Sequence, residues 1–208
     1  MEEVRGEKIV IRFDGHKCIH ARQCVTGAPR TFLANVEGPW IHPDATPVDH
    51  LVEVAHRCPS GAITYERLDG ARAEAPPAVN LITIRENGPL AVNAEILIAG
   101  ETASVRATLC RCGASKRKPY CDGSHVAAGF QASGEPPTKT ADALAARDGA
   151  VAFTPIKDGP LMAEGNLEIC SGTGRIVERT TKTWLCRCGA SQNKPFCDGS
   201  HKAAGFTG

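Results

Sequence analysis

The sequence lacks the features that mark membrane, nucleic-acid and nucleotide-binding proteins. No apolar run approaches the roughly 20 residues that span a bilayer, and the first residues, MEEVRGE, have no apolar signal-peptide core. The 24 Lys and Arg side chains nearly cancel the 23 Asp and Glu side chains, so no overall attraction to nucleic acid or anionic lipid is expected. Glycine-rich phosphate-binding motifs and nucleophile–base constellations are absent. We therefore predict a cytoplasmic protein that is not an enzyme and that binds neither nucleic acid nor membrane.

Large rings are also scarce, whereas cysteine is abundant. Aromatic residues make up 5% of the chain, and 21 Gly with 14 Pro favour turns and short elements over long helices. Ten cysteines recur at patterned spacings. In a reducing compartment such patterns indicate metal ligands before disulfides.

The richest cysteine pattern occurs twice. Residues 110–125 (CRCGASKRKPYCDGSH) return almost unchanged as residues 186–201 (CRCGASQNKPFCDGSH). Upstream, NGPL at 87–90 is matched by DGPL at 158–161. The second copy is slightly longer, and the Gly-rich segment 171–175 is the natural place for the insertion. The sequence thus contains an internal repeat.

Two spacers divide the chain. Residues 73–78 (AEAPPA) are rich in proline and alanine, and residues 131–149 combine a Ser-Gly-Glu-Pro-Pro stretch with an alanine-rich run that predicts one short helix. This division predicts three modules, at 1–70, 79–130 and 150–208.

Local patterns predict short elements in each module. Strands are expected at 8–13, 62–65, 81–84, 94–98, 161–169 and 181–185, and an amphipathic helix at 48–56. Asp122 and Asp198 stand where an N-cap would begin a short helix through the following histidine. A repeat of about 50 residues buries little apolar surface alone, so we expect the two copies to pack face to face.

The repeated motif offers three thiols and one imidazole, and its chemistry leaves three interpretations open. Structural zinc uses such donors, although zinc ligand pairs usually have two to four intervening residues and here there is one. A [2Fe–2S] core takes two ligands per iron, which suits Cys110 with Cys112 and Cys121 with His125. Disulfides are the third reading.

The motif is similar to the signature of the CDGSH iron–sulfur proteins, the mitoNEET family, at every signature position of both copies. This resemblance implies one [2Fe–2S] cluster per copy and favours iron–sulfur over zinc. Because many family members are homodimers with one motif per chain, a chain with two implies an internal pseudo-dimer and a monomer. The implied ligands are Cys110, Cys112, Cys121, His125, Cys186, Cys188, Cys197 and His201.

Other signature residues have expected roles. Ser115 and Ser191 are predicted to donate hydrogen bonds to cluster or cysteine sulfur, with a plain turn hydroxyl as the alternative. Arg111 and the run Lys116 to Lys118 place positive charge near the first cluster, either for docking an acidic redox partner or as a solvated loop. Since imidazole titrates near pH 6.5, we predict that both [2Fe–2S] clusters are lost below about pH 6.

The N-terminal module carries a different ligand pattern. Cys18, Cys24 and a Cys-Pro pair at Cys58 keep the order of a ferredoxin ligand set, but Ala21 stands at the middle position. Residues 8–68 resemble the divergent mono-cluster ferredoxin domain. Three cysteines are enough for a [3Fe–4S] cluster, which we favour. A [4Fe–4S] cluster needs a fourth ligand, from the neighbouring His20 or from solvent.

Cys170, the tenth cysteine, is predicted to be a small buried residue, because the first repeat has alanine at the corresponding position.

The predicted fold class is α+β, with a small ferredoxin-like N-terminal module followed by two β-rich CDGSH modules packed as a pseudo-twofold unit. The first functional hypothesis is electron transfer, from an N-terminal cluster of lower potential to the His-ligated pair. The second is a pH- or redox-responsive cluster donor or sensor, because each His ligand is a weak point. A zinc-bound interaction module is the third. The expected partners are redox proteins or apo iron–sulfur acceptors.

Overall fold

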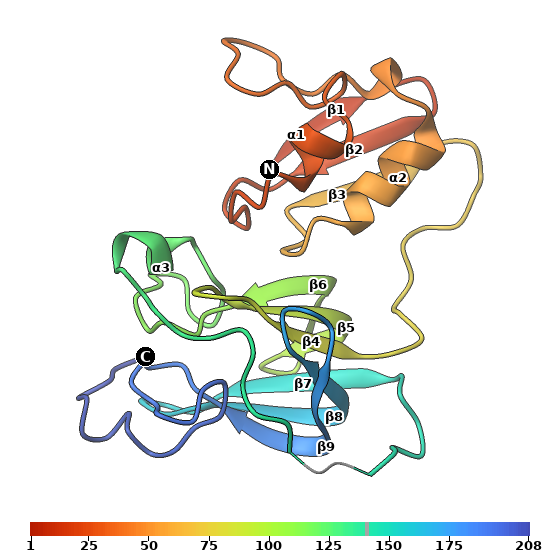
Figure 1. The fold of residues 1–208 in the computed structure, drawn as a ribbon. Helices are drawn as coiled ribbons and strands as arrows, with labels where there is room; N and C mark the ends of the chain where they lie inside the picture. The colour runs from red at the N-terminus through yellow and green to blue at the C-terminus, as the bar shows by residue number, and fades with distance from the viewer. Residues whose placement is uncertain (140–141) are drawn as a thin grey trace. The chain divides into compact units, whose positions relative to one another are not determined.

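The protein, seen in a computed structural model, folds into two compact units, residues 1–75 and 76–208 (Figure 1). The structure describes residues 1–139 and 142–208, without the side chains of 101–103. The first unit combines three strands with short helices, and the second is built mainly from strands, which agrees with an α+β, β-rich chain. Within the described residues, no helix is long and apolar enough to cross a membrane.

The first unit is a three-stranded antiparallel sheet in the order β1-β2-β3. Its strands are β1 (Glu2–Arg5), β2 (Ile9–Phe13) and β3 (Ile63–Arg67), and its helices are α1 (Gln23–Gly27), the 3-10 turn η1 (Pro43–Ala45) and α2 (Val48–His56).

Helix α2 covers the sheet with one apolar face. Leu51, Val54 and Ala55 lie at the i, i+3, i+4 spacing and are almost fully buried in one cluster with strand residues. Asp49 in the first turn and His56 in the last turn complement the helix dipole. Burial of each large apolar side chain stabilises this unit by about 1.5–3 kcal/mol relative to exposure. Cys24 of α1 and Cys58 after α2 pack against this cluster, so the core positions both thiols.

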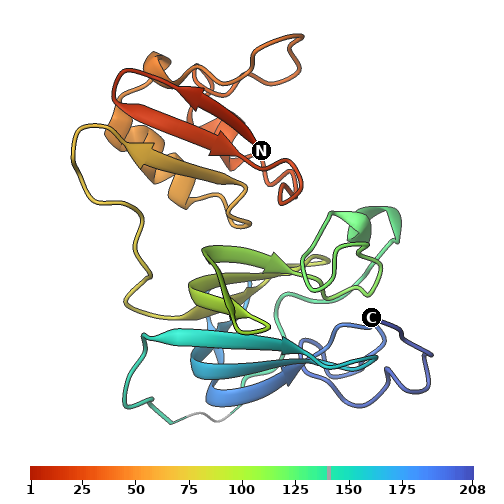
Figure 2. The same cartoon turned by 180° about the vertical axis from the view of Figure 1, so that it is seen from behind.

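In its described residues, the second unit is a six-stranded sheet with one short helix, α3 (Ser124–Ala127) (Figure 2). The strands are β4 (Leu81–Ile84), β5 (Leu90–Ile98), β6 (Glu101–Leu109), β7 (Ala150–Pro155), β8 (Leu161–Cys170) and β9 (Ile176–Leu185). β5 alternates buried and more exposed residues from Leu90 to Ile96, the period of a strand with one face on a core. The antiparallel pairs β5–β6 and β8–β9 form the long hairpins of the two repeats.

The two repeats exchange strand contacts. β4 of the first repeat runs parallel to β8 of the second, with Ile82 opposite Ile169. β7 of the second repeat runs parallel to β5 of the first, with Phe153 opposite Ile98. Because each short strand pairs with a long strand from the other repeat, the repeats share one sheet.

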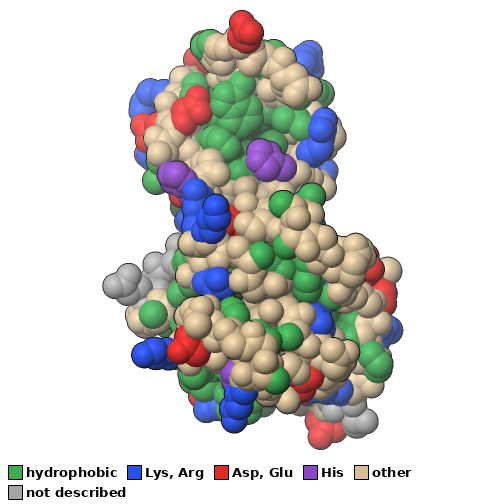
Figure 3. Space-filling view, turned by 90° about the vertical axis from the view of Figure 1, so that its left-hand side faces the viewer, with side chains coloured by type: hydrophobic (Ala, Val, Ile, Leu, Met, Phe, Trp, Pro, Cys, Tyr) green, Lys and Arg blue, Asp and Glu red, His purple; other side chains and the backbone are tan. Residues whose placement is uncertain are grey.

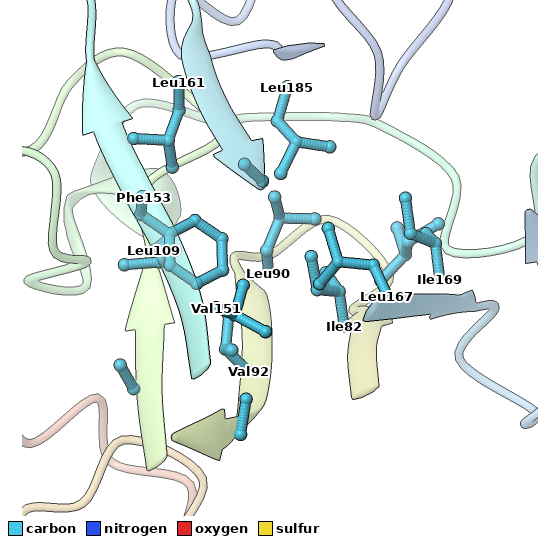
Figure 4. Packing of buried hydrophobic residues seen from close by; sticks show 14 of the residues in the cluster. Ile82, Leu90, Val92, Leu109, Val151, Phe153, Leu161, Leu167, Ile169 and Leu185 are labelled. Carbon is cyan, nitrogen blue, oxygen red and sulfur yellow. The ribbon is translucent and has the colours of Figure 1, made fainter. Parts of the chain in front are cut away.

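One core joins both repeats. The close-up shows apolar side chains from each copy directed toward one another (Figure 4). Leu90 and Leu109 from the first repeat and Phe153 and Leu185 from the second are at most 1% exposed. Shared burial compensates for the small apolar area that a single repeat could enclose.

Most of the predicted elements are present. The helix at 48–56 and the strand at 81–84 have the predicted bounds, and the insertion lies in the turn between β8 and β9. A short helix through the histidine forms in the first copy, with Gly123 instead of the predicted Asp122 at its N-cap, but the second copy has a turn there. The sequence reading missed β1, β6 and β7. The helix predicted in 131–149 is absent from its described residues, and positions 140–141 lie outside the described residues.

Candidate metal centres

In the first repeat, backbone hydrogen bonds gather the predicted ligands at the end of β6. Cys110 directly follows this strand, and its N–H donates to Pro119 O at 2.8 Å, while the N–H of Cys121 donates to Thr108 O at 2.9 Å. Helix α3 then carries His125. These bonds close the loop between the second and third cysteines.

The four donors form two pairs. Cys110 Sγ and Cys112 Sγ lie 3.7 Å apart, and Cys121 Sγ lies 3.5 Å from His125 Nδ1. Burial lowers the pKa of His125 below its usual value, although Asp122 opposes this shift. The imidazole is therefore neutral at pH 7, the form that binds a metal.

The second repeat reproduces this geometry. Cys186 Sγ and Cys188 Sγ lie 3.6 Å apart, and Cys197 Sγ lies 3.4 Å from His201 Nδ1. The N–H of Cys186 donates to Pro195 O at 2.8 Å, as its counterpart does in the first repeat. The two copies therefore present equivalent donor sets.

The pair distances fit ligands that share a tetrahedral metal. Two thiolates with metal–sulfur bonds of about 2.3 Å are separated by about 3.7 Å on a tetrahedral edge, and a thiolate and an imidazole by about 3.5 Å. Across residues 1–139 and 142–208, no group of three or more Cys, His, Asp or Glu side chains is arranged to hold a single ion. Two donor pairs per repeat match the two ligands per iron that a two-iron core would need.

Backbone N–H groups point at the ligand sulfurs. Ala114 N donates to Cys112 Sγ and Gly123 N to Cys121 Sγ, each at 3.4 Å. Gly123 adopts a φ of 86°, in the left-handed region that glycine enters without strain, so the chain turns sharply beside the thiol. Such hydrogen bonds stabilise thiolate charge and raise the reduction potential of a bound cluster.

Two buried thiols, Cys121 and Cys186, hold their protons when no metal is bound, whereas the hydrogen bond with Cys112 lowers the pKa of the Cys110 thiol. Burial raises the pKa of Cys121 and of Cys186 to about 11. Because metal binding must displace these protons, affinity increases with pH.

Of the two predicted roles for the serine hydroxyls, the hydrogen bonds favour the turn hydroxyl over a bond to sulfur. Ser115 Oγ donates to Tyr120 O at 2.6 Å, and Ser191 Oγ donates to Phe196 O at 2.7 Å. A hydroxyl has one proton to donate, and each is used on a backbone carbonyl. Both serines are turn hydroxyls that shape the ligand loop.

The charged loop is also corrected in part. Arg111 is 1% exposed and cannot meet a partner at the surface, whereas Lys116 and Arg117 are exposed. The sequence pattern, with arginine between two cysteines, gave no sign of this burial.

The N-terminal cysteines surround a cavity of about 310 Å³. Cys18, Cys24 and Cys58 line it together with Ala21 and His20. Burial raises the pKa of Cys24, and the charges of the other two thiols raise it further. The cavity thus brings the three predicted ligands together, with alanine at the position where related ferredoxins have a cysteine.

The surroundings of this cavity are largely apolar. Phe13 and Trp40 line it and pack edge to face with ring centroids 4.9 Å apart. In the space-filling view a group of hydrophobic side chains with a histidine beside it is visible on the surface of the first unit (Figure 3). The contact found for His20 is a backbone one, its N–H donating to Cys18 Sγ at 3.4 Å.

Cys170 is buried in β8, 5% exposed, as predicted for a small core residue. Burial raises the pKa of its thiol.

Comparison with known proteins matches both kinds of site. The family model described as iron-binding zinc finger, CDGSH type, matches residues 87–126 and 158–202. The model described as divergent 4Fe-4S mono-cluster matches residues 4–68. The chain belongs to the CDGSH family through its repeats and to the mono-cluster family through its N-terminal unit. It is therefore an iron–sulfur protein.

Two curated relatives also match part of the chain. The chain is 42% identical over 60 residues to the uncharacterized protein YjdI of Escherichia coli K12, and equally to YjdI of strain O157:H7. The matched segment is 29% of this chain and 78% of each relative.

Proposed function

We propose that the protein is an electron carrier with three clusters, two of them [2Fe–2S] clusters with three cysteine ligands and one histidine ligand each. The observation that carries this proposal is the spacing of the donors: in both repeats a Cys–Cys pair and a Cys–His pair lie at tetrahedral edge distances. The eight ligands are the cysteines and histidines of the two motifs.

In the N-terminal unit we propose a [3Fe–4S] cluster on Cys18, Cys24 and Cys58. The support is the count of thiols around the cavity, because Ala21 cannot ligate iron. A [4Fe–4S] cluster is the second candidate, with His20 or solvent as its fourth ligand. In either form the group is held by the order of ligands that a ferredoxin uses, and we propose a ferredoxin-like module at residues 1–70.

The repeats, which we treat as CDGSH modules at 79–130 and 150–208, are proposed to form a pseudo-twofold unit within a monomer. Reciprocal strand pairing supports this arrangement, since Ile82 opposite Ile169 in β4–β8 has its counterpart in Phe153 opposite Ile98 in β5–β7.

The clusters are the proposed active groups, and the protein is not proposed to be an enzyme. An all-thiolate cluster has a lower potential than clusters with histidine ligands, so electrons pass from the N-terminal cluster to the pair. The proposed setting is the cytoplasm, with redox proteins as partners and no binding to nucleic acid or membranes.

A second candidate function is the donation of clusters to apo iron–sulfur acceptors. It rests on the single imidazole at each [2Fe–2S] site, which protons compete for near physiological pH.

Anaerobic purification followed by iron and sulfide analysis, EPR and a stepwise redox titration tests the carrier. We expect two [2Fe–2S] signals and one three-iron signal, with the three-iron cluster reduced at the lowest potential. A colourless protein that contains zinc overturns the proposal, and reduction in the reverse order overturns the direction of transfer. Rapid transfer of clusters to an apo-ferredoxin, without reversible reduction, favours the donor instead.

A further inference from the structure

The arginine between the first two cysteines of each motif is buried, and its guanidinium joins separate backbone segments. We call this arrangement a clamp. Arg111 is 1% exposed, and its guanidinium donates to the carbonyl oxygens of Gly88 at 3.0 Å, Ser133 at 3.1 Å and Arg85 at 2.6 Å. Its charged end also lies 5.4 Å from the centre of the Phe130 ring. The clamp ties the ligand loop to the turn before β5 and to the segment after α3.

Arg187 repeats the arrangement in the second copy. It is 2% exposed, and it donates to the carbonyl oxygens of Gly159 at 3.0 Å and Gly208 at 2.9 Å. Its guanidinium lies 5.3 Å from the centre of the Phe206 ring.

Carbonyl oxygens satisfy the N–H groups of these side chains but do not neutralise their charge. Burying a cation without an anion costs several kcal/mol. Glu86 interacts electrostatically with Arg111, and Asp158 with Arg187. The thiolates of each motif are the further anionic groups, and the ligand loops supply them. Three thiolates and a neutral imidazole leave a bound [2Fe–2S] cluster with net negative charge, and its reduction adds one more.

The two ligand loops touch across the repeats. A Cβ placed on Gly113 would lie 2.6 Å from Cys188 O and 3.3 Å from Arg187 O. A Cβ on Gly189 would likewise collide with Cys112 O. Because only glycine allows this approach, the Cys-Arg-Cys segment of each repeat is held against that of the other.

The electrostatic contacts follow the same crossed pattern. Arg111 interacts with Cys186 of the other repeat, and Arg187 interacts with Cys110.

We propose that Arg111 and Arg187 are the internal counter-charges of the two [2Fe–2S] clusters, each acting on the cluster of the opposite repeat as well as on its own. This rests on the proposed function, because it requires the clusters. A fixed cation in a region of low dielectric stabilises an arriving electron, so each arginine raises both reduction potentials.

The test measures the second cluster alone while the first repeat is changed. In a Cys121→Ser background, which cannot complete the first ligand set, Arg111→Gln is expected to make reduction of the second cluster about tenfold less favourable, or about 59 mV lower in potential. Lys116→Gln removes the same formal charge from the exposed part of the same loop and is the matched control. An unchanged potential of the second cluster in Arg111→Gln overturns the proposal.

Arg111→Lys separates charge from clamping. It keeps the positive charge and loses the planar fork, so the potential is expected to be restored while thermal stability falls. If Arg111→Gln fails to retain the second cluster, retention in Arg111→Lys supports the counter-charge, and loss in both variants overturns it. Arg187→Gln in a Cys197→Ser background repeats the test on the first cluster.

Iron and sulfide analysis of the unchanged protein distinguishes failure of the proposed function from failure of the counter-charge inference. Absence of iron and sulfide defeats the proposed function itself. Clusters that are present but insensitive to both arginines defeat only this inference.

Discussion

The ligand loop of the first repeat exposes Lys116 and Arg117, whereas the second repeat exposes the uncharged Gln192 and Asn193 at the same positions. The interiors agree far better: the Cys–Cys separations are 3.7 and 3.6 Å, and the Cys–His separations 3.5 and 3.4 Å. Metal geometry and the shared sheet restrict which residues can occupy the interior of a repeat. At the two exposed loop positions, which we call the rim, charged and uncharged side chains are both compatible with solvent. The comparison therefore separates the interior residues that would hold a cluster from the exposed loop residues that would contact a partner.

Loss of a ligand is expected to break the equivalence of the repeats most completely. Cys121→Ser removes a thiolate that no neighbour replaces, so the first [2Fe–2S] cluster is lost while the second is retained. Cys197→Ser is expected to give the reverse. Iron and sulfide per chain, with the visible spectrum, measure both. Cys170→Ser is the control, and loss of both clusters from either ligand variant would contradict independent sites.

Ala21→Cys is expected to convert the N-terminal cluster from a three-iron to a four-iron form. The new thiol would line the cavity that already holds three cysteines and would supply the missing ligand. EPR of the oxidised protein should lose its three-iron signal, and iron per chain should rise. Thr26→Cys, on an exposed position outside the cavity, should leave the signal in place. Persistence of the three-iron signal in Ala21→Cys would contradict the open ligand position.

Acid is expected to discriminate histidine from cysteine ligation. The pKa of His125 is lowered by burial, so its imidazole is neutral at pH 7 and becomes protonated only as the pH falls below its usual value near 6.5. Both [2Fe–2S] clusters should therefore decay faster as the pH drops from 8 to 5. His125→Cys should slow the decay of the first cluster several-fold at pH 6, and His201→Cys that of the second. Equal decay in all three proteins, followed by visible absorbance, would refute histidine as the weak ligand.

The exposed rims are expected to give the smallest effect. Replacing Lys116 and Arg117 by Gln and Asn copies the second rim onto the first. Oxidation of the reduced first cluster by an anionic oxidant should slow by less than about tenfold, and the difference should shrink as salt is added. Stopped-flow rates at two ionic strengths measure this. The reverse exchange, Gln192→Lys with Asn193→Arg, should accelerate the second cluster.

The sequence allowed the candidate ligand sets to be predicted because metal chemistry strongly restricts residue type and spacing, and the structure brings the residues of each pair together. Helix α2 was also predictable, since its apolar spacing is regular and it lies between a proline and the Cys-Pro pair. Strand β7 was missed, because its partner β5 belongs to the other repeat and no local pattern reports a contact over that sequence distance. Arg111 was read as a surface charge for a similar reason: its acceptors come from two distant segments, around Gly88 and Ser133.

The serines show a different limit. A hydroxyl near a thiol in sequence can in principle donate a hydrogen bond to sulfur. The path of the backbone determines which acceptor the hydroxyl actually reaches. The turn at Pro119 brings Tyr120 O within 2.6 Å of Ser115 Oγ, and this carbonyl oxygen accepts the hydrogen bond from the hydroxyl.

Strand exchange between the repeats has a consequence for how such a chain can be divided. If the connection through 131–149 were cut and the halves separated, β4 would lose β8, and β7 would lose β5. Each half would then present an open strand edge that a second copy of itself could fill, which yields a symmetric two-chain assembly. Fusing the halves removes the dependence of that assembly on protein concentration. It also frees the two surfaces to differ, which identical subunits can never do.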